Sequence, residues 1–349
     1  MVGKATGFAL TDNDPVRIFG LPKKMLLEFR ILSKPCSVIR GITVDTVERL
    51  EKARETSSLK TRLVLNGRAG CGKSFLLLQM VEHCIASDWI VVYIPRAVNL
   101  VNSTTPYEYD LRTQTYLQPT FAFQTLQRLQ TVNSVTLSAL TTHKKLVFEK
   151  REVPQGTSLF DLVGVALKDP ASAPVILDSL MSELSVQTKH PVLLAVDDFQ
   201  ALYCKTAYRD PHFSAIRPYH LAIPRLILDF ASGKRSFAKG AVLGAITKSD
   251  TNYTVPLELQ DALGLPYEQF TSPYDKRSKT LIEYTKGLRS MPVPAQLSVP
   301  EAASLFEVWM KDKAIVPTDY DEIFLAKYTE SSGNARDFVW KGLLETLQS

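Results

Sequence analysis

Short apolar runs alternate with longer amphipathic segments along most of this chain. Five runs are typical of strands buried on both faces of a parallel sheet, the last run being the most polar: residues 62–66, 88–95, 190–199, 240–250 and 265–274. Apolar residues at helical spacing predict helices over residues 44–55, 74–88, 121–132, 158–169 and 173–187. Strands that alternate with helices predict an α/β fold, with a five-stranded parallel sheet and helices on both faces.

The pattern changes after residue 274, where strand-like runs give way to helical spacing. We expect a C-terminal helical lid made of residues 276–288, 299–312, 319–330 and 335–348. At the other end, residues 1–43 carry scattered prolines and glycines, which predicts an extension that docks on the core. The predicted division of the chain is therefore 1–43, 44–274 and 275–349.

The stretch GRAGCGKS, residues 67–74, has the spacing of a phosphate-binding loop, G-x-x-x-x-G-K-[ST]. Its glycines let successive backbone N–H groups point at phosphate oxygens, and Lys73 would reach the β- and γ-phosphates. A strand-like run precedes the loop and a helical segment follows it, which is the required order. The core at 44–274 is therefore predicted to be a P-loop nucleotide-binding core, with these binding residues: Gly67, Arg68, Ala69, Gly70, Cys71, Gly72, Lys73, Ser74 and Phe75.

Two further positions complete a predicted magnesium site. The Ser74 hydroxyl would ligate Mg²⁺ beside the phosphates. The apolar run VLLAV ends at Asp197, the carboxyl end of a predicted strand, where ligands bind in open α/β sheets.

The next residue, Asp198, bears on catalysis. It takes the position at which AAA-like ATPases usually carry a glutamate that polarises the attacking water. A carboxylate displaced by one methylene is poorly placed for that role, and small misplacements cost much rate. Asp198 is therefore a candidate catalytic residue in a site that favours binding over hydrolysis.

The stretch AITKSD, residues 245–250, has three interpretations. Thr247, Lys248 and Asp250 fit the T-K-x-D form of a guanine-reading motif. In AAA-like order, the strand after the magnesium strand ends in a polar sensor of the γ-phosphate, which would be Thr247 or Ser249. The third interpretation is an ordinary polar loop at a strand end.

A second sensor is a hypothesis for SSGNARDF, residues 331–338. Arg336 would lie one residue into a lid helix and would reach back to the phosphates. The alternative is a helix start with Asn334 as its cap and a solvated Arg336.

Composition narrows the classes of function. The 349 residues are 45% hydrophobic and 22% charged, as in globular proteins, and no run of eighteen apolar residues predicts a membrane span. The net charge of +5 suits an anionic partner such as RNA, although basic clusters are also typical of solvated surfaces. Four cysteines without a C-x-x-C pair indicate neither a zinc ribbon nor a redox motif. The first sixteen residues resemble neither a secretory signal nor a transit peptide.

In this order, the motifs resemble the death-associated protein three family of P-loop proteins in the mitochondrial small ribosomal subunit. The stretches that carry the resemblance lie between residues 19 and 285: GLPKKMLLEFRIL, DWIVVYIP, FEKREVPQGTSLFDLV, LLAVDDFQALY and GAVLGAITKSD. The resemblance implies an AAA-like fold, mitochondrial matrix localisation on the ribosome, and a largely structural GTP or GDP, rather than ATP, with Mg²⁺. It also implies contacts with small-subunit rRNA, with other mitochondrial ribosomal proteins and, through an intersubunit bridge, with the large subunit. The T-K-x-D stretch departs from the family.

The sequence thus predicts a ribosomal protein that holds a guanine nucleotide to stabilise its fold, with slow hydrolysis at most. Two alternatives stay open: an active AAA-like ATPase and a nucleotide-gated switch outside the ribosome. The ATPase would need a water-activating carboxylate and an arginine finger. The switch would need different affinities for the nucleotide in two conformations.

Overall fold

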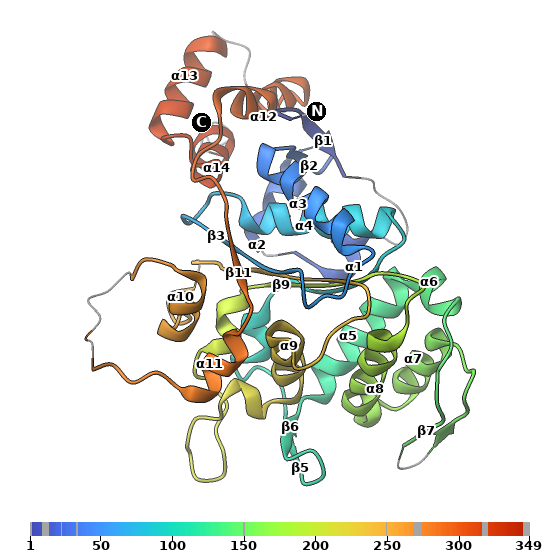
Figure 1. Ribbon diagram of the computed structural model, residues 1–349. Helices are drawn as coiled ribbons and strands as arrows, with labels where there is room; N and C mark the ends of the chain where they lie inside the picture. Colours follow the sequence, from blue (N-terminus) through green and yellow to red (C-terminus); the bar gives the residue numbers. More distant parts are fainter. Residues whose placement is uncertain are drawn as a thin grey trace.

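The protein is described from a computed structural model of its 349 residues. The described residues are 2–8, 14–21, 23–32, 34–148, 151–248, 250–267, 272, 274–315 and 320–344. Within these ranges the structure confirms the predicted fold class: a five-stranded parallel sheet has helices on both faces, and a helical region lies at the C-terminal end (Figure 1). No helix in the described ranges is long and apolar enough to cross a bilayer.

The central sheet runs in the order β11-β3-β10-β9-β4, and every neighbouring pair is parallel. Its strands are β3 (Arg62–Asn66), β4 (Ile90–Ile94), β9 (Val192–Asp197), β10 (Gly240–Ala245) and β11 (Arg289–Pro292). β10 lies between β3 and β9, so that Ala245 pairs with Leu65 on one side and with Asp197 on the other. The carboxyl ends of the strands therefore meet at one edge of the sheet.

The inner strands are apolar on both faces because a layer of helices covers each face. Successive residues of a strand point to opposite faces, so Leu193 and Ala195 enter one core while Leu194 and Val196 enter the other. The first layer contains α1 (Pro15–Phe19), α2 (Lys23–Ile31), α3 (Gly41–Ala53) and α4 (Lys73–Ala86). The opposite layer contains α5 (Pro119–Val132), α6 (Ser134–Ser138), α7 (Leu159–Lys168), α8 (Ala173–Val186), α9 (Ala222–Ser232), α10 (Leu257–Leu263) and α11 (Lys279–Thr285).

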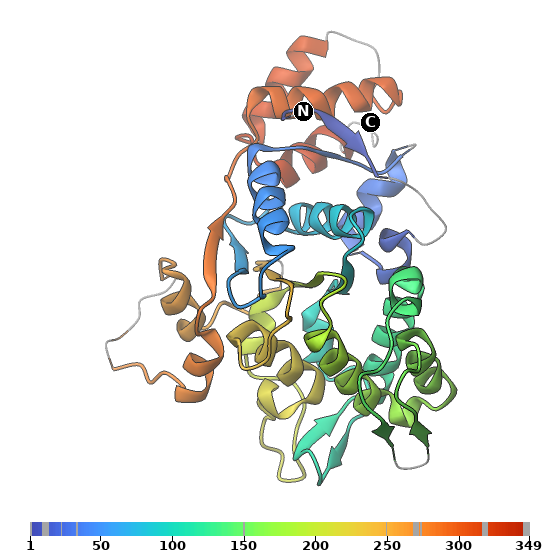
Figure 2. The same ribbon diagram turned by 45° about the vertical axis from the view of Figure 1, so that its right-hand side comes forward.

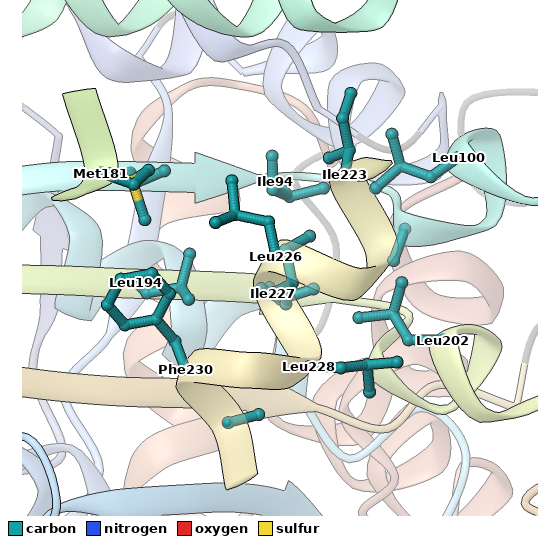
Figure 3. Close-up of a cluster of buried hydrophobic side chains, with 14 of the residues drawn as sticks. Ile94, Leu100, Met181, Leu194, Leu202, Ile223, Leu226, Ile227, Leu228 and Phe230 are labelled. Atoms are coloured by element: carbon teal, nitrogen blue, oxygen red, sulfur yellow. The ribbon is translucent and has the colours of Figure 1, made fainter. Parts of the chain in front are cut away.

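Helix α9 is absent from the sequence prediction. It buries Ile223, Leu226, Ile227 and Phe230 at helical spacing, beside Leu194 of β9 (Figure 3). Pro224, the third residue of the helix, is tolerated there because the first N–H groups of a helix have no intrahelical acceptor. A proline within an apolar run conceals a helix of this kind from pattern analysis.

The C-terminal helices form a separate small core above the sheet (Figures 1 and 2). They are α12 (Val299–Lys311), α13 (Tyr320–Glu330) and α14 (Ala335–Val339), followed by a π-helical turn at Trp340–Leu344. Trp309 stacks on Phe338 with ring centroids 5.0 Å apart, so α12 and α14 are joined by aromatic packing. Residues 345–348 of the predicted last helix lie outside the described residues.

Three two-stranded antiparallel pairs complete the fold: β1 (Ala5–Gly7) with β2 (Cys36–Val38), β5 (Glu108–Asp110) with β6 (Thr115–Leu117), and β7 (Leu146–Val147) with β8 (Glu152–Val153). The N-terminal segment contacts the C-terminal helices just before β1, where the hydroxyl of Ser304 in α12 donates to the carbonyl of Gly3. The amide of Gln79 in the core donates to the hydroxyl of Ser37 at 2.9 Å, so the predicted docking segment at 1–43 contacts both other predicted regions.

The fifth strand of the sheet lies elsewhere than predicted. Residues 265–267, 272 and 274 are not in a strand, and residues 268–271 and 273 lie outside the described residues. The fifth strand is β11, an edge strand of sequence RSMP in which only Met291 is buried, so no apolar run marks it. Because β11 follows residue 274, the predicted boundary between core and C-terminal region divides the sheet.

Candidate nucleotide-binding site

The loop between β3 and α4 has the backbone of a phosphate cradle. Gly67, Gly70 and Gly72 have φ angles of 145°, 79° and 96°, in the region that favours glycine. Gly72 is the N-cap of α4, and no side chain caps that helix end. The first N–H groups of the helix are thus placed for an anion, and the helix dipole adds to the attraction.

Lys73 is held at the centre of this loop. Its side chain is buried, and Nζ donates to the carbonyl oxygens of Gly67 at 3.0 Å and Arg68 at 2.8 Å. Burial lowers the pKa of Lys73, whereas nearby Asp197 raises it. A phosphate would add the negative charge that this buried ammonium lacks.

The predicted magnesium ligands, Ser74 and Asp197, lie together at the carboxyl edge of the sheet. The Ser74 hydroxyl, at the start of α4, donates to the carboxylate of Asp197, the last residue of β9. Burial raises the pKa of Asp197, and the neighbouring charge of Asp198 is the second cause of that rise. A cation at this point would lower the electrostatic cost of these two adjacent buried carboxylates, because its positive charge would neutralise theirs.

Asp198 is restrained on several sides. Its backbone lies in the left-handed region, with φ 55°, and its N–H donates to Oδ1 of Asp197 at 2.9 Å. Its carboxylate accepts from the Thr247 hydroxyl, and Nε of Arg96 lies 3.7 Å from Oδ2. Gln200 fixes Thr247 in turn, because its amide donates to the carbonyl of Thr247 at 2.8 Å and accepts from its N–H at 3.2 Å. The position of the Asp198 carboxylate is therefore set by Thr247 and Arg96.

A cavity of about 500 Å³ opens on this edge of the sheet, a size typical of small-ligand sites. Most of the predicted residues line it: Ala69, Gly70, Cys71, Gly72, Lys73, Ser74, Phe75, Asp197, Asp198, Thr247 and Arg336. Gly67 and Arg68 do not line it, and act instead through the carbonyls that hold Lys73. The opposite end of the cavity is apolar and is formed by α2 and the C-terminal helices.

Arg40 is a site residue that sequence reasoning missed. Its guanidinium donates to the carbonyl of Cys71 at 2.9 Å and to the carbonyl of Gln296 at 2.6 Å. It also forms an ion pair with Glu301 of α12, at 3.3 Å between Nε and Oε2, and both side chains are almost buried. Arg40 thus joins the N-terminal segment, the phosphate loop and the C-terminal helices. No local sequence motif predicts this role.

The C-terminal segment also packs directly on the phosphate loop. The Asn334 side-chain amide donates to the carbonyl of Ala69 at 2.9 Å, and the Arg336 N–H donates to the carbonyl of Gly70 at 3.0 Å. Asn334 also caps α14, as the sequence suggested. Arg336 therefore contacts the loop through its backbone, while its side chain lines the cavity.

The T-K-x-D stretch follows β10 and stands at the phosphate end of the cavity. Thr247 contacts Asp198, and Lys248 acts electrostatically on Lys73. Lys248 and Asp250 line the cavity there, whereas Ser249 lies outside the described residues. The position of Thr247 suits the sensor interpretation better than the base-reading one.

The basic clusters at residues 143–145, 150–151, 234–235 and 275–279 are paired in part with acids of the same chain. The ion pairs are Lys145–Glu152, Lys234–Glu283, Arg235–Asp178 and Arg277–Asp261. Lys150, in the 150–151 cluster, lies outside the described residues. Part of the positive charge of these clusters is therefore neutralised within the chain.

The donor set suits Mg²⁺ that is shared with phosphates. Among the described residues, no group of three or more histidine, cysteine or acidic side chains forms a metal cage. Mg²⁺ typically takes only one or two carboxylates and completes its shell with phosphate oxygens and water. The pair of Ser74 and Asp197 beside an anion cradle fits that arrangement.

Comparisons with known proteins extend these observations. Residues 37–340 match the model of the mitochondrial ribosomal death-associated protein 3 family. Small ribosomal subunit protein mS29 of Neurospora crassa is 28% identical over 318 residues, which cover 87% of this chain and 66% of that protein. The Schizosaccharomyces pombe protein of the same name is 25% identical, covering 92% of this chain and 67% of that protein. The Bos taurus protein of that name is 26% identical over 227 residues, or 64% of this chain and 57% of that protein. The chain thus spans about two thirds of the length of the fungal relatives.

Among solved structures, the Aeropyrum pernix ORC2 protein in its ADP form is similar over 93% of this chain and 64% of its own. The TM-score is 0.38 and the sequence identity is 12%.

Proposed function

The chain belongs to the mitochondrial ribosomal death-associated protein 3 family, and from this premise we propose that it is a structural component of the mitochondrial small ribosomal subunit that holds a guanine nucleotide with Mg²⁺. The nucleotide acts as a stabilising ligand in the P-loop cavity. The observation that carries this proposal is the position of the cavity, where the N-terminal segment, the sheet and the C-terminal helices meet.

Each part of the site has a role toward such a ligand. The loop N–H groups and Lys73 hold the phosphates, and Ser74 and Asp197 hold the cation. When bound, Mg²⁺ supplies positive charge that offsets both phosphates and carboxylates. A ligand there contacts the three parts of the chain at once and has no comparable site in the unfolded chain, so its binding energy stabilises the fold.

The same geometry argues against rapid turnover. A general base must reach the water that it activates, and its own hydrogen bonds must leave it available. The Asp198 side chain is one methylene shorter than the glutamate of active AAA-like sites, and it is held away from that role by Thr247 and Arg96. We therefore propose that the nucleotide is held and is hydrolysed slowly at most.

We further propose ribosomal partners. The family is mitochondrial and ribosomal, and the net charge of +5 suits an assembly rich in phosphate. Small-subunit rRNA and neighbouring ribosomal proteins are the expected contacts, with the large subunit reached through an intersubunit bridge.

Two measurements on the native protein test the proposal. Sucrose-gradient sedimentation of mitochondrial lysate should place the protein with the small subunit. Denaturation of the purified protein followed by chromatography with mass detection should release about one GDP or GTP per chain. Lys73→Ala should lose the nucleotide, whereas Lys60→Ala, a change at an exposed lysine, should keep it. A protein that sediments free of the subunit, or a Lys73→Ala variant that keeps full occupancy, would contradict the proposal.

A further inference from the structure

Positive charge gathers at the amino edge of the central sheet. Arg62 begins β3, and Arg289 begins the neighbouring strand β11, which follows α11 in the chain (Figure 1). Arg289 pairs in register with Leu63, the residue after Arg62. Lys286 is the C-cap of α11 and precedes β11. Because the strands are parallel, these three cations lie at the end of the sheet opposite to the phosphate loop, and none of them lines the nucleotide cavity.

Arg62 is fixed in place by main-chain carbonyls. Its guanidinium donates to the carbonyl oxygens of Ala231 at 3.1 Å, Lys286 at 2.9 Å and Leu59 at 3.3 Å. Gly287 has φ 75°, and a Cβ atom there would lie 2.7 Å from Cζ of Arg62, so the close approach requires glycine. The three acceptors are neutral, so they orient the guanidinium without cancelling its charge.

The charge of this edge is not balanced by acids of the chain. None of the ion pairs between described residues includes Arg62, Lys286 or Arg289. Glu283 of α11 is paired instead with Lys234, at 3.7 Å. Burial lowers the pKa of Arg62, and the positive charge of Arg289 is the second cause of that decrease. Two guanidinium groups that repel each other have an electrostatic cost, and an anion between them would remove it.

We propose that Arg62, Lys286 and Arg289 form a binding site for the phosphodiester backbone of RNA. Lys286 and Arg289 are exposed and therefore accessible to a large partner. The planar guanidinium of Arg289 can bind one phosphate through two N–H groups, and Lys286 adds a point charge. Arg62 supplies a third charge whose position is set before the partner arrives. The inference deepens the proposed function, on which it rests for the choice of rRNA as the partner.

Two observations favour RNA over other anions. RNA carries a phosphate on every nucleotide, so one strand can meet several cations of the same edge, whereas a single phosphate ion would leave most of that charge unmatched. The chain also belongs to a mitochondrial ribosomal family, in which RNA is the polyanion at hand. The nucleotide and the RNA would then bind at opposite edges of one sheet.

The test measures binding of a mitochondrial small-subunit rRNA transcript to the full chain, by filter binding at several KCl concentrations. The double variant Lys286→Gln/Arg289→Gln should bind the transcript about tenfold or more weakly than wild type, because two charge-assisted contacts are lost. The plot of log K against log[KCl] should become shallower by about 1.5, because fewer counterions are released. Both side chains are exposed, so Tm and nucleotide content should stay at the wild-type values.

A matched double variant controls for net charge. Lys168→Gln/Lys205→Gln removes the same charge at two exposed lysines, one at the end of α7 and one between β9 and α9. It should weaken binding of the transcript by less than about twofold, because these lysines lie outside the proposed site.

The outcomes separate this inference from the proposed function. Equal weakening by the two double variants would mean that net charge alone attracts the RNA, and unchanged binding by Lys286→Gln/Arg289→Gln would mean that this edge does not contact it. Either result overturns the inference. A loss of binding to phosphatidylcholine–cardiolipin vesicles, with binding of the transcript retained, would assign the edge to a lipid surface and would also overturn it. Sedimentation with the small subunit and release of GDP or GTP are measured separately, so the proposed function stands or fails independently.

Discussion

At the scale of single residues, the phosphate loop is supported by main-chain carbonyls that serve distant partners. The carbonyls of Ala69, Gly70 and Cys71 accept from Asn334, Arg336 and Arg40 respectively. Carbonyls that point outward leave N–H groups of the same loop directed inward, as an anion site requires. The contacts that brace the loop are therefore also contacts that orient it.

Gly70 is the most constrained of these positions, and it gives the first prediction. A Cβ atom there would lie 2.4 Å from Oδ1 of Asn334 and 3.0 Å from Cβ of Arg336, on a backbone with φ 79°. Gly70→Ala should lower the free energy of unfolding by about 3 kcal/mol, from left-handed strain together with the clash. Urea denaturation measures this difference.

Gly156→Ala is the matched control for that substitution. Gly156 has φ 85° but nothing within 4 Å of its Cβ position, so only the strain remains, about 1 kcal/mol. Equal losses in the two variants would mean that the C-terminal segment does not pack on the loop in solution.

At the scale of elements, α12 is joined to the loop by the Arg40–Glu301 pair. Removing one member of a nearly buried pair leaves the other charge without its partner, which typically costs 3–5 kcal/mol. Arg40→Ala should therefore reduce the free energy of unfolding by about 3 kcal/mol, again read from urea denaturation. Lys311→Ala should cost less than about 0.5 kcal/mol, because its pair with Glu307 on the same helix is exposed. A small effect of Arg40→Ala would refute its role as a junction.

The packing of α1 against α4 gives a prediction about pH. Asp14, the buried N-cap of α1, and Glu82 of α4 each have a carboxylate oxygen with no hydrogen-bond partner in the described structure. Burial, with Asp14 as second cause, raises the pKa of Glu82 to about 7 from 4.5. A raised carboxyl pKa means that the folded state favours the protonated form of Glu82. The stability that this preference gives to the fold is complete below about pH 4.5 and is lost as the pH rises to 7.

We expect this loss to amount to about 1–2 kcal/mol, because Glu82 is only partly buried. Glu82→Gln should remove this component and should be more stable than wild type above pH 7, since its amide can donate to Asp14. Urea midpoints at several values between pH 5 and 8 measure the effect. The exposed Glu48→Gln should keep the wild-type profile. Parallel profiles for Glu82→Gln and wild type would show that Glu82 titrates normally.

At the scale of the whole molecule, the cavity couples parts of the chain that are distant in sequence. A ligand at one hundred times its Kd adds about 2.7 kcal/mol to stability. GDP with Mg²⁺ should therefore raise Tm in proportion to the logarithm of its concentration. Hydrogen exchange should slow most at amides around Arg40 and Arg336 together, and more there than in α7, which lies on the far side of the sheet. Protection confined to the phosphate loop would mean that the ligand does not join the three parts.

The sequence by itself determined the features that depend on local spacing. The apolar runs at β3, β4, β9 and β10 mark strands because both faces of a parallel sheet exclude water. The glycine spacing of residues 67–74 defines the phosphate loop because the backbone there needs positive φ at fixed positions. Such features involve neighbours along the chain, so their pattern is complete in the sequence.

Tertiary structure alone decided which distant residues meet. The strand order β3-β10-β9 places Ser74, which follows β3, beside Asp197 at the end of β9. No single apolar run in the sequence predicts that strand order. The edge strand β11 carries little apolar signal, because Met291 is the one buried residue among its four, whereas β4 at the other edge is buried throughout. Arg40 and Glu28 look like ordinary surface charges in sequence and become cavity residues only when the C-terminal helices pack over them. Their roles depend on burial and on partners some 260 to 310 positions away, and those are properties of the folded chain.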